Sequence, residues 1–195
     1  MNLQNIIMLA LLFIYTNCNA QHNHPETVVS AKDTQTSMQS GNKMMDFKTK
    51  FGAILSAYIQ LKNALVNNDP KAASAAGKLV MNAIKAIDLK SMTNEQNLVW
   101  MLYAEKISYD AEHINGTPEA AHQREHFMSL SKNLYDMAKA FNANTEDLYF
   151  QFCPMANDGK GAYWISEQSK IRNPYYGKKM LSCGSTKETL PAVRR

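Results

Sequence analysis

The chain lacks the sequence features of several large functional classes. It has no arginine-rich run and no basic patch interleaved with aromatic residues, so its net charge of +4 indicates solubility rather than a nucleic-acid surface. It also has no Ser–His–Asp pattern, nucleophile elbow, phosphate-binding glycine loop or distinctive carboxylate pair, which argues against an enzyme. Glycine and proline are scarce, with eight and six among 195 residues, and this scarcity favours helical structure.

Long apolar runs are scarce as well. The run Ile6–Tyr15 is too short to span a bilayer, and no later segment is long and apolar enough to do so. Cys18-Asn19-Ala20 follows it, with small residues at the positions that a signal peptidase recognises. We therefore expect residues 1–20 to be a signal peptide and the chain to be exported, to the periplasm of a Gram-negative-type envelope. The alternative is lipid attachment at Cys18, the only route we foresee to a membrane.

An apolar pattern typical of α-helices begins at Met44. The stripe from Phe47 to Leu65 repeats at spacings of three and four residues. The starts of three further helices carry capping signals: Asp69-Pro70, Thr93 with Gln96, and Thr117-Pro118. Residues 44–144 are thus predicted to form four helices with short connections, an antiparallel up-down bundle. The polar residues 21–43 are predicted to be a disordered leader.

The helical pattern ends at Asn144. Residues 145–190 contain turn signals, and Leu148–Phe152 alternates like a short strand or extended segment. We predict an all-α fold in which this segment is a loop-rich cap, packed across the four-helix bundle through Trp164 and several tyrosines. Residues 44–190 would then form a single domain.

The cap holds both cysteines that remain after removal of residues 1–20, and each has a methionine close by. Cys153 and Met155 are two positions apart, and Met180 and Cys183 are three apart. Thiolates and thioethers select soft metal ions. The four residues are therefore candidate ligands for Cu(I) or Ag(I).

The same two cysteines also fit a disulfide. An exported cysteine pair is oxidised unless a metal protects it, and a bridge from Cys153 to Cys183 would contribute about 3–4 kcal/mol in the chain-entropy model. Spacing alone does not separate the two states, and the neighbouring methionines favour the metal. The pair is also able to serve both roles as a redox-gated metal site. A thiol-redox enzyme is disfavoured, because the cysteines are not arranged as Cys-x-x-Cys.

Three histidines are candidate nitrogen ligands. His122 and His126 are four residues apart on one face of a predicted helix, and His113 lies near the end of the preceding helix. A pair at this spacing can hold a metal ion, although the segment does not have the residue order of the zinc-protease motif. The alternative is that these histidines are solvated helix residues beside the buried stripe.

Several of these segments occur together in a recognisable set. They are Gln123-Arg124-Glu125-His126-Phe127, Phe152-Cys153-Pro154-Met155-Ala156, Gly159 to Ser166, Ile171 to Gly177, Met180-Leu181 and Cys183-Gly184. The set resembles a bacterial family of secreted domains of unknown function, over about residues 47–190. Domains of that family stand alone behind signal peptides or are appended to the periplasmic adaptor subunits of copper and silver efflux pumps. The resemblance therefore implies heavy-metal handling.

We predict a periplasmic protein, not an enzyme, that binds Cu(I) or a related soft ion and either sequesters it or passes it to an efflux adaptor. The predicted ligands are Cys153, Met155, Met180 and Cys183, with His126 (and after it His113 or His122) as a nitrogen ligand from the bundle. The alternative is an interaction module without metal, stapled by a Cys153–Cys183 disulfide, whose aromatic cap docks a partner protein of the envelope.

Overall fold

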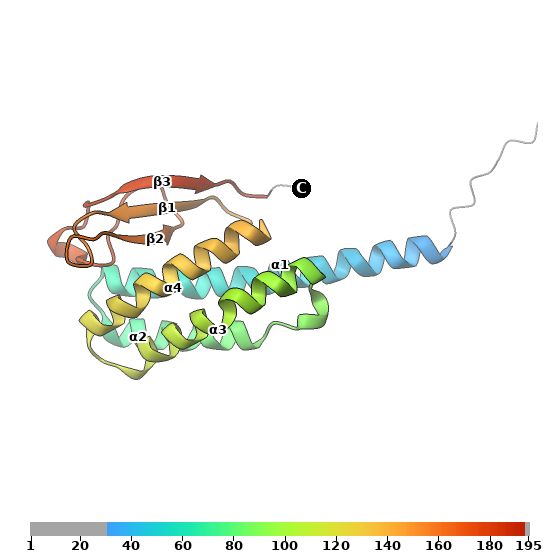
Figure 1. Cartoon of the computed structure of the whole chain (residues 1–195), viewed down its shortest axis with the longest axis horizontal. Coiled ribbons are helices and arrows are strands. Elements are labelled where there is room, and N and C mark those ends of the chain that lie inside the picture. Colours follow the sequence, from blue (N-terminus) through green and yellow to red (C-terminus); the bar gives the residue numbers. More distant parts are fainter. Residues whose placement is uncertain (1–30, 194–195) are drawn as a thin grey trace, which may run out of the picture.

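The computed structural model describes residues 31–193. The predicted signal peptide and Cys18 lie outside this range. Within it the chain forms four α-helices followed by a three-stranded antiparallel sheet (Figure 1). The elements are α1 Ala31–Val66, α2 Pro70–Lys85, α3 Asn94–Gly116, α4 Ala120–Phe141, β1 Leu148–Cys153, β2 Ala162–Ser166 and β3 Ser185–Leu190, with short 3-10 turns η1 Leu89–Ser91 and η2 Gly177–Lys179. In the described residues no helix has the length and apolarity needed to cross a bilayer.

The four predicted helices are confirmed, but the all-α class is wrong because the cap is a sheet. Its strand order is β2-β1-β3. The alternating segment Leu148–Phe152 corresponds to β1, whereas β3 has the sequence Ser-Thr-Lys-Glu-Thr-Leu and is largely exposed. An edge strand of this kind is held by backbone pairing rather than by an apolar face. It therefore leaves little apolar pattern in the sequence.

The first helix is longer than predicted. It begins at Ala31 rather than Met44, so the prediction of a disordered leader is wrong for residues 31–43; residues 21–30 lie outside the described range. Once a helix is nucleated by its packed part, each further residue adds one hydrogen bond. The segment before Met44 contains no proline to stop this extension. Figure 1 shows the start of α1 projecting beyond the other helices.

Consecutive helices pack against each other, and the sheet covers one side of the pair α1 and α4 (Figure 1). These two helices meet through aromatic side chains: Phe51 packs edge-on against Phe141 at 5.1 Å between ring centroids, and Tyr58 stacks on Phe127 at 5.3 Å. Trp164 of β2 is fully buried. The largest side chain of the cap is therefore part of the same core as the helices.

A buried hydroxyl group, that of Tyr58, connects the sheet to the two helices beneath it. The Tyr58 hydroxyl lies 2.8 Å from Ser131 Oγ and accepts a hydrogen bond from the backbone N–H of Ile165 at 3.0 Å. It therefore joins α1, α4 and β2 at one point. Burial raises the pKa of Tyr58 far above its ordinary value, so the hydroxyl keeps its proton.

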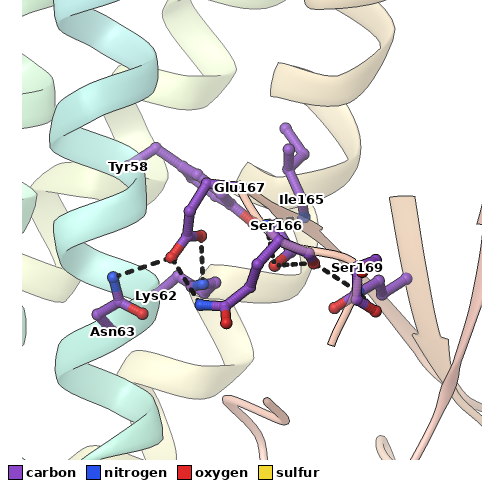
Figure 2. Close-up of polar contacts among 9 residues, drawn as sticks. Tyr58, Lys62, Asn63, Ile165, Ser166, Glu167 and Ser169 are labelled. Carbon is purple, nitrogen blue, oxygen red and sulfur yellow. Dashed lines mark hydrogen bonds and ion pairs between the residues drawn. The ribbon is translucent and has the colours of Figure 1, made fainter. Parts of the chain in front are cut away.

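An ion pair lies next to this hydroxyl. The Lys62 side chain is fully buried, and its Nζ donates to Glu167 Oε2 at 2.5 Å. Figure 2 shows Glu167 reaching from the end of β2 back to α1, where Asn63 also meets its carboxylate. Burial lowers the pKa of Lys62, and Glu167 opposes that effect. Burial alone would raise the pKa of Glu167, but the hydrogen bond and charge of Lys62 outweigh it and lower the pKa.

We expect Glu167→Gln to destabilise the domain by about 1–3 kcal/mol, because Lys62 is then buried without a counter-charge. Loss of one partner from a fully buried pair costs about 3–5 kcal/mol, and the figure is reduced here because Glu167 is partly exposed to water. The double variant Lys62→Met/Glu167→Gln should recover most of the loss. Urea unfolding at pH 7 measures both. A double variant as unstable as Glu167→Gln would contradict this role of the ion pair.

The contribution of Glu167 should also depend on pH. Its pKa is lower in the folded than in the unfolded protein, so its stabilisation is present above the unfolded pKa of about 4.3 and is lost as the pH falls through the folded pKa. The stability difference between the native chain and Glu167→Gln should therefore shrink below about pH 4. Unfolding midpoints compared from pH 3 to pH 7 test this, and a difference that stays constant over the range would contradict it.

Candidate functional site

The two cysteines of the cap are in contact. Cys153 is the last residue of β1, Cys183 lies just before β3, and their Sγ atoms are 2.8 Å apart although 30 positions separate them in the sequence. Both are free thiols; Cys153 is buried and Cys183 is partly exposed. The fold, rather than sequence proximity, therefore brings the pair together, as the sequence predicted.

Each cysteine belongs to a tight turn that also contains a methionine. The Ala156 N–H donates to the Cys153 carbonyl at 3.4 Å, and the Cys183 N–H donates to the Met180 carbonyl at 3.0 Å. The backbone N–H of Met155 also faces the Cys183 thiol. Met155 and Met180 are 54% and 37% exposed, so neither methionine fills the core. The four sulfur residues therefore belong to two adjoining turns.

Asn173 holds the segment that leads to Cys183. Its side chain is buried, and its Oδ1 accepts from the backbone N–H groups of Tyr175 at 2.8 Å and Tyr176 at 3.3 Å. Its Nδ2 donates to the Cys183 carbonyl at 2.9 Å, and its backbone N–H donates to the Leu181 carbonyl at 2.9 Å. One asparagine thus closes its own turn and fixes the second cysteine.

The two tyrosines that follow Asn173 connect this turn to the rest of the cap. The Tyr176 hydroxyl donates to the Met155 carbonyl, and the Tyr175 hydroxyl donates to the Tyr163 carbonyl in β2. Burial raises the pKa of Tyr175 well above its ordinary value, so this hydroxyl stays a donor. The turn therefore links β2 to the Cys153–Met155 turn.

Gly184 allows the close approach of the two cysteines. Its φ is +137°, and an added Cβ would lie 2.8 Å from the Phe152 carbonyl oxygen and 2.9 Å from the Trp164 ring. No other residue leaves space for the backbone at this point. Glycine here lets the chain pass over Trp164 with Cys183 directed against Cys153.

The surroundings of the Cys183 thiol favour its protonated form. The hydrogen bond between the Cys183 thiol and Cys153 Sγ raises the pKa of Cys183, and so does partial burial, while the N–H of Met155 lowers it to a smaller degree. Because a metal ion binds the thiolate, any such ion must displace protons from this pair.

The three predicted histidine ligands lie elsewhere. His126 on α4 faces α3, where its Nδ1 is 3.0 Å from Asp110 Oδ1, and it is in ring contact with both His113 and His122. The cap packs on a different side of α4, where Arg124 donates to the Pro174 carbonyl at 2.8 Å. Among the described side chains, no hydrogen bond or ring contact links a histidine to either cysteine. The structure therefore divides the predicted ligand set into a sulfur group and an imidazole group.

Neither group is preassembled around an ion. In residues 31–193, no three side chains of histidine, cysteine, aspartate or glutamate already have a geometry that could hold a metal. Methionine thioethers are a further class of donor, and the sulfur group has two of them. Metal binding at either group therefore requires some movement of side chains.

Sequence reasoning missed the polar side chains that fasten the helices to each other and to the cap. Gln123 is fully buried and donates to carbonyls at the start of α2 and beyond the end of α3, Pro70 at 2.9 Å and Thr117 at 2.8 Å. Lys62 is the second buried polar side chain of this kind, and it joins α1 to the cap through Glu167. Both occupy positions four residues from an aromatic residue of the buried stripe, Phe127 and Tyr58. A long polar side chain on an apolar stripe is the signal that would have found them.

Comparison with known proteins gives one match. Neither the curated proteins nor the solved structures contain a match to this chain. Residues 54–146, from within α1 to just before β1, match a family described as "Protein of unknown function (DUF3347)". The motifs of the cap lie beyond the end of this match. The helical part of the chain is thus similar to a family of domains of unknown function.

Proposed function

We propose that this protein binds a soft monovalent metal ion, Cu(I) or Ag(I), through the four sulfur residues Cys153, Met155, Met180 and Cys183. The observation that carries the proposal is the joining of two Cys/Met turns with the cysteine sulfurs 2.8 Å apart. Two thiolates and two thioethers form a donor set that soft ions prefer. Histidine is not needed for this site.

The local structure supports a site that opens by a small movement. With metal–sulfur bonds of about 2.3 Å, two sulfurs on one ion lie roughly 3.5–4.5 Å apart, so the thiols must separate from their present contact. Cys153 is fixed in β1, whereas Cys183 lies in a partly exposed segment before β3. Rotation of the Cys183 side chain, while its carbonyl stays bound to Asn173, would admit the ion, and the exposed methionines would complete the set.

We further propose that the protein is exported and either sequesters the ion or passes it to efflux machinery. Support comes from residues 1–20, which have the pattern of a signal peptide, and from the resemblance of the cap motifs to domains appended to copper and silver efflux adaptors. A free cysteine pair in an oxidising compartment needs protection, and a bound metal supplies it.

A second candidate function is an interaction module without metal. It is supported by the same sulfur contact, because 2.8 Å is shorter than the spacing of roughly 3.5–4.5 Å between two sulfurs on one ion, and a small further approach would reach the disulfide bond length of about 2.05 Å. In this form a disulfide bond between Cys153 and Cys183 would crosslink the cap, and the surface of the cap would bind a partner protein of the envelope. The two functions differ in the redox state of the pair.

We expect the reduced protein to bind one Cu(I) per chain in an anaerobic titration against a competing chelator. The variant Cys153→Ser/Cys183→Ser should lose this binding, and Met155→Leu or Met180→Leu should weaken it by about tenfold each. Met101→Leu is the matched control, because Met101 is 77% exposed on α3. Equal affinities for the native chain and the double serine variant would end this proposal.

The affinity for Cu(I) should increase with pH. Because the pKa of Cys183 is raised, its thiol is protonated at neutral pH, and the metal ion must displace that proton. At higher pH protons compete less strongly with the ion for the sulfur. Each displaced proton contributes a slope of about one log unit in affinity per pH unit below the thiol pKa. Titrations between pH 6 and pH 8 measure this slope. An affinity that does not change over this range would contradict coordination by the thiol pair.

Counting thiols separates the two candidate functions. Protein isolated from an oxidising compartment and then stripped of metal without oxygen should have two reactive thiols per mature chain if a bound metal kept the pair reduced, and none if a disulfide formed. If the disulfide is structural, its reduction should lower stability by about 3–4 kcal/mol. A chain with no free thiols and that stability loss would favour the interaction module.

A further inference from the structure

A second cluster of metal-ligating side chains lies where α3 packs against α4. The imidazole ring of His126 has its centroid 4.5 Å from that of His113 and 4.8 Å from that of His122. Tyr109 lies against the first of these rings, at 4.1 Å from His113. Three imidazoles on two neighbouring helices therefore occupy one small region of the surface.

Each of the three rings has its Nδ1 paired with an oxygen that accepts hydrogen bonds. His126 Nδ1 lies 3.0 Å from Asp110 Oδ1, His113 Nδ1 lies 2.9 Å from the Tyr109 carbonyl, and His122 Nδ1 lies 3.2 Å from Glu125 Oε2. A carbonyl or a carboxylate cannot donate, so the ring proton of a neutral imidazole stays on Nδ1. Every ring therefore keeps the lone pair of its Nε2 for another partner.

The partner of the central ring is itself held in place. Asp110 is 5% exposed, and its second oxygen accepts from the Ser129 hydroxyl at 2.6 Å. A buried carboxylate on the Nδ1 of a histidine is the arrangement that orients metal-ligating imidazoles in proteins and increases their basicity. This cluster has such a carboxylate on His126, a backbone carbonyl on His113 and a second carboxylate on His122.

We infer that His113, His122 and His126 form a site for a divalent late-transition-metal ion, bound through their Nε2 atoms. A metal–nitrogen bond of about 2.0–2.1 Å places the centroids of two ligating rings roughly 5 Å apart. The separations here are 4.5 Å for the stacked rings of His113 and His126, whose planes differ by 29°, and 4.8 Å for His122 and His126, whose planes differ by 76°. The rings do not yet converge on a point; His126 keeps its bond to Asp110, and rotation of the His113 and His122 side chains must supply that step. A water molecule would take the fourth position.

This site is distinct from the sulfur site in chemistry and in place. Imidazole suits Zn²⁺, Cu²⁺ and Ni²⁺, whereas thiolates and thioethers select Cu(I). The side chains of His122 and His126 are 44% and 17% exposed, so an ion reaches them from solvent without disturbing the cap. Occupation of one site does not require the other.

Titration with Co²⁺ and Zn²⁺ tests the inference in a chain that lacks the other candidate donors. The starting protein has Cys153→Ser and Cys183→Ser, together with His22→Gln and His24→Gln. We expect one equivalent of Co²⁺ to give the visible absorption of a four-coordinate ion, without a sulfur-to-cobalt band. One equivalent of Zn²⁺ should displace it and raise the thermal unfolding midpoint.

Single substitutions in that protein decide the outcome. His113→Gln, His122→Gln and His126→Gln should each weaken Zn²⁺ binding by tenfold or more, and Asp110→Asn should weaken it by about 10–100-fold through the ring that it orients. His122→Gln should disturb packing less than His126→Gln, because the His122 side chain is 44% exposed and that of His126 is 17% exposed. Circular dichroism checks the fold of all four variants. Absence of the cobalt spectrum, or an affinity unchanged in His122→Gln and His126→Gln, would overturn the site. Either result leaves Cu(I) binding by the native cysteines intact.

Discussion

The antiparallel pairing of β1 with β3 is the interaction on which the candidate chemistry depends. Its register shifts by one residue between Phe150 and Gln151, where Phe150 pairs with Glu188 but Gln151 pairs with Thr186. This irregularity brings Ser185 opposite Phe152, and Cys183, two residues before Ser185, is in contact with Cys153. Without the extra residue in β3, Ser185 would pair with Cys153. Cys183 would then lie beyond the end of β1, away from Cys153. A β-bulge that redirects a side chain in this way is a common feature beside functional sites.

The sheet in turn depends on polar contacts made inside an apolar layer. A small three-stranded sheet does not bury enough surface to be stable alone, and here Trp164 enters the core between the helices. The carboxylate of Glu167 and the backbone N–H of Ile165 meet Lys62 and the Tyr58 hydroxyl on α1. Because an unpaired group in this layer would be costly, these contacts admit one position of β2 on α1 and α4. The position of β2 fixes β1, and β1 fixes Cys153.

Much of the helical part could be predicted from the sequence, because its signals are local. Capping residues such as Asp69 and Thr93 and the apolar stripes determine where helices begin and which face they bury. The cap could not be predicted as a sheet, because β3 is polar and depends on a partner 33 or more residues earlier, as in the pairing of Ser185 with Phe152 and of Leu190 with Leu148. The contact of Cys153 with Cys183 followed from the motifs, but the separation of the histidines did not. The side of α4 that meets the cap carries Arg124 and Phe127, which contact Pro174 and Tyr175, and no spacing rule predicts those contacts.

The division of donors between two faces of α4 has a chemical consequence. A single site of two thiolates and several imidazoles would suit Zn²⁺ and Cu²⁺ as well as Cu(I), and so would discriminate poorly. A site of sulfur donors alone, with the histidines held on the α3 side by Asp110, would favour Cu(I) over the harder divalent ions through ligand type. The raised pKa of Cys183 adds to this selection, since an ion must bind sulfur strongly enough to displace a proton. The packing of α4 between cap and α3 is therefore what would keep the two kinds of metal chemistry apart.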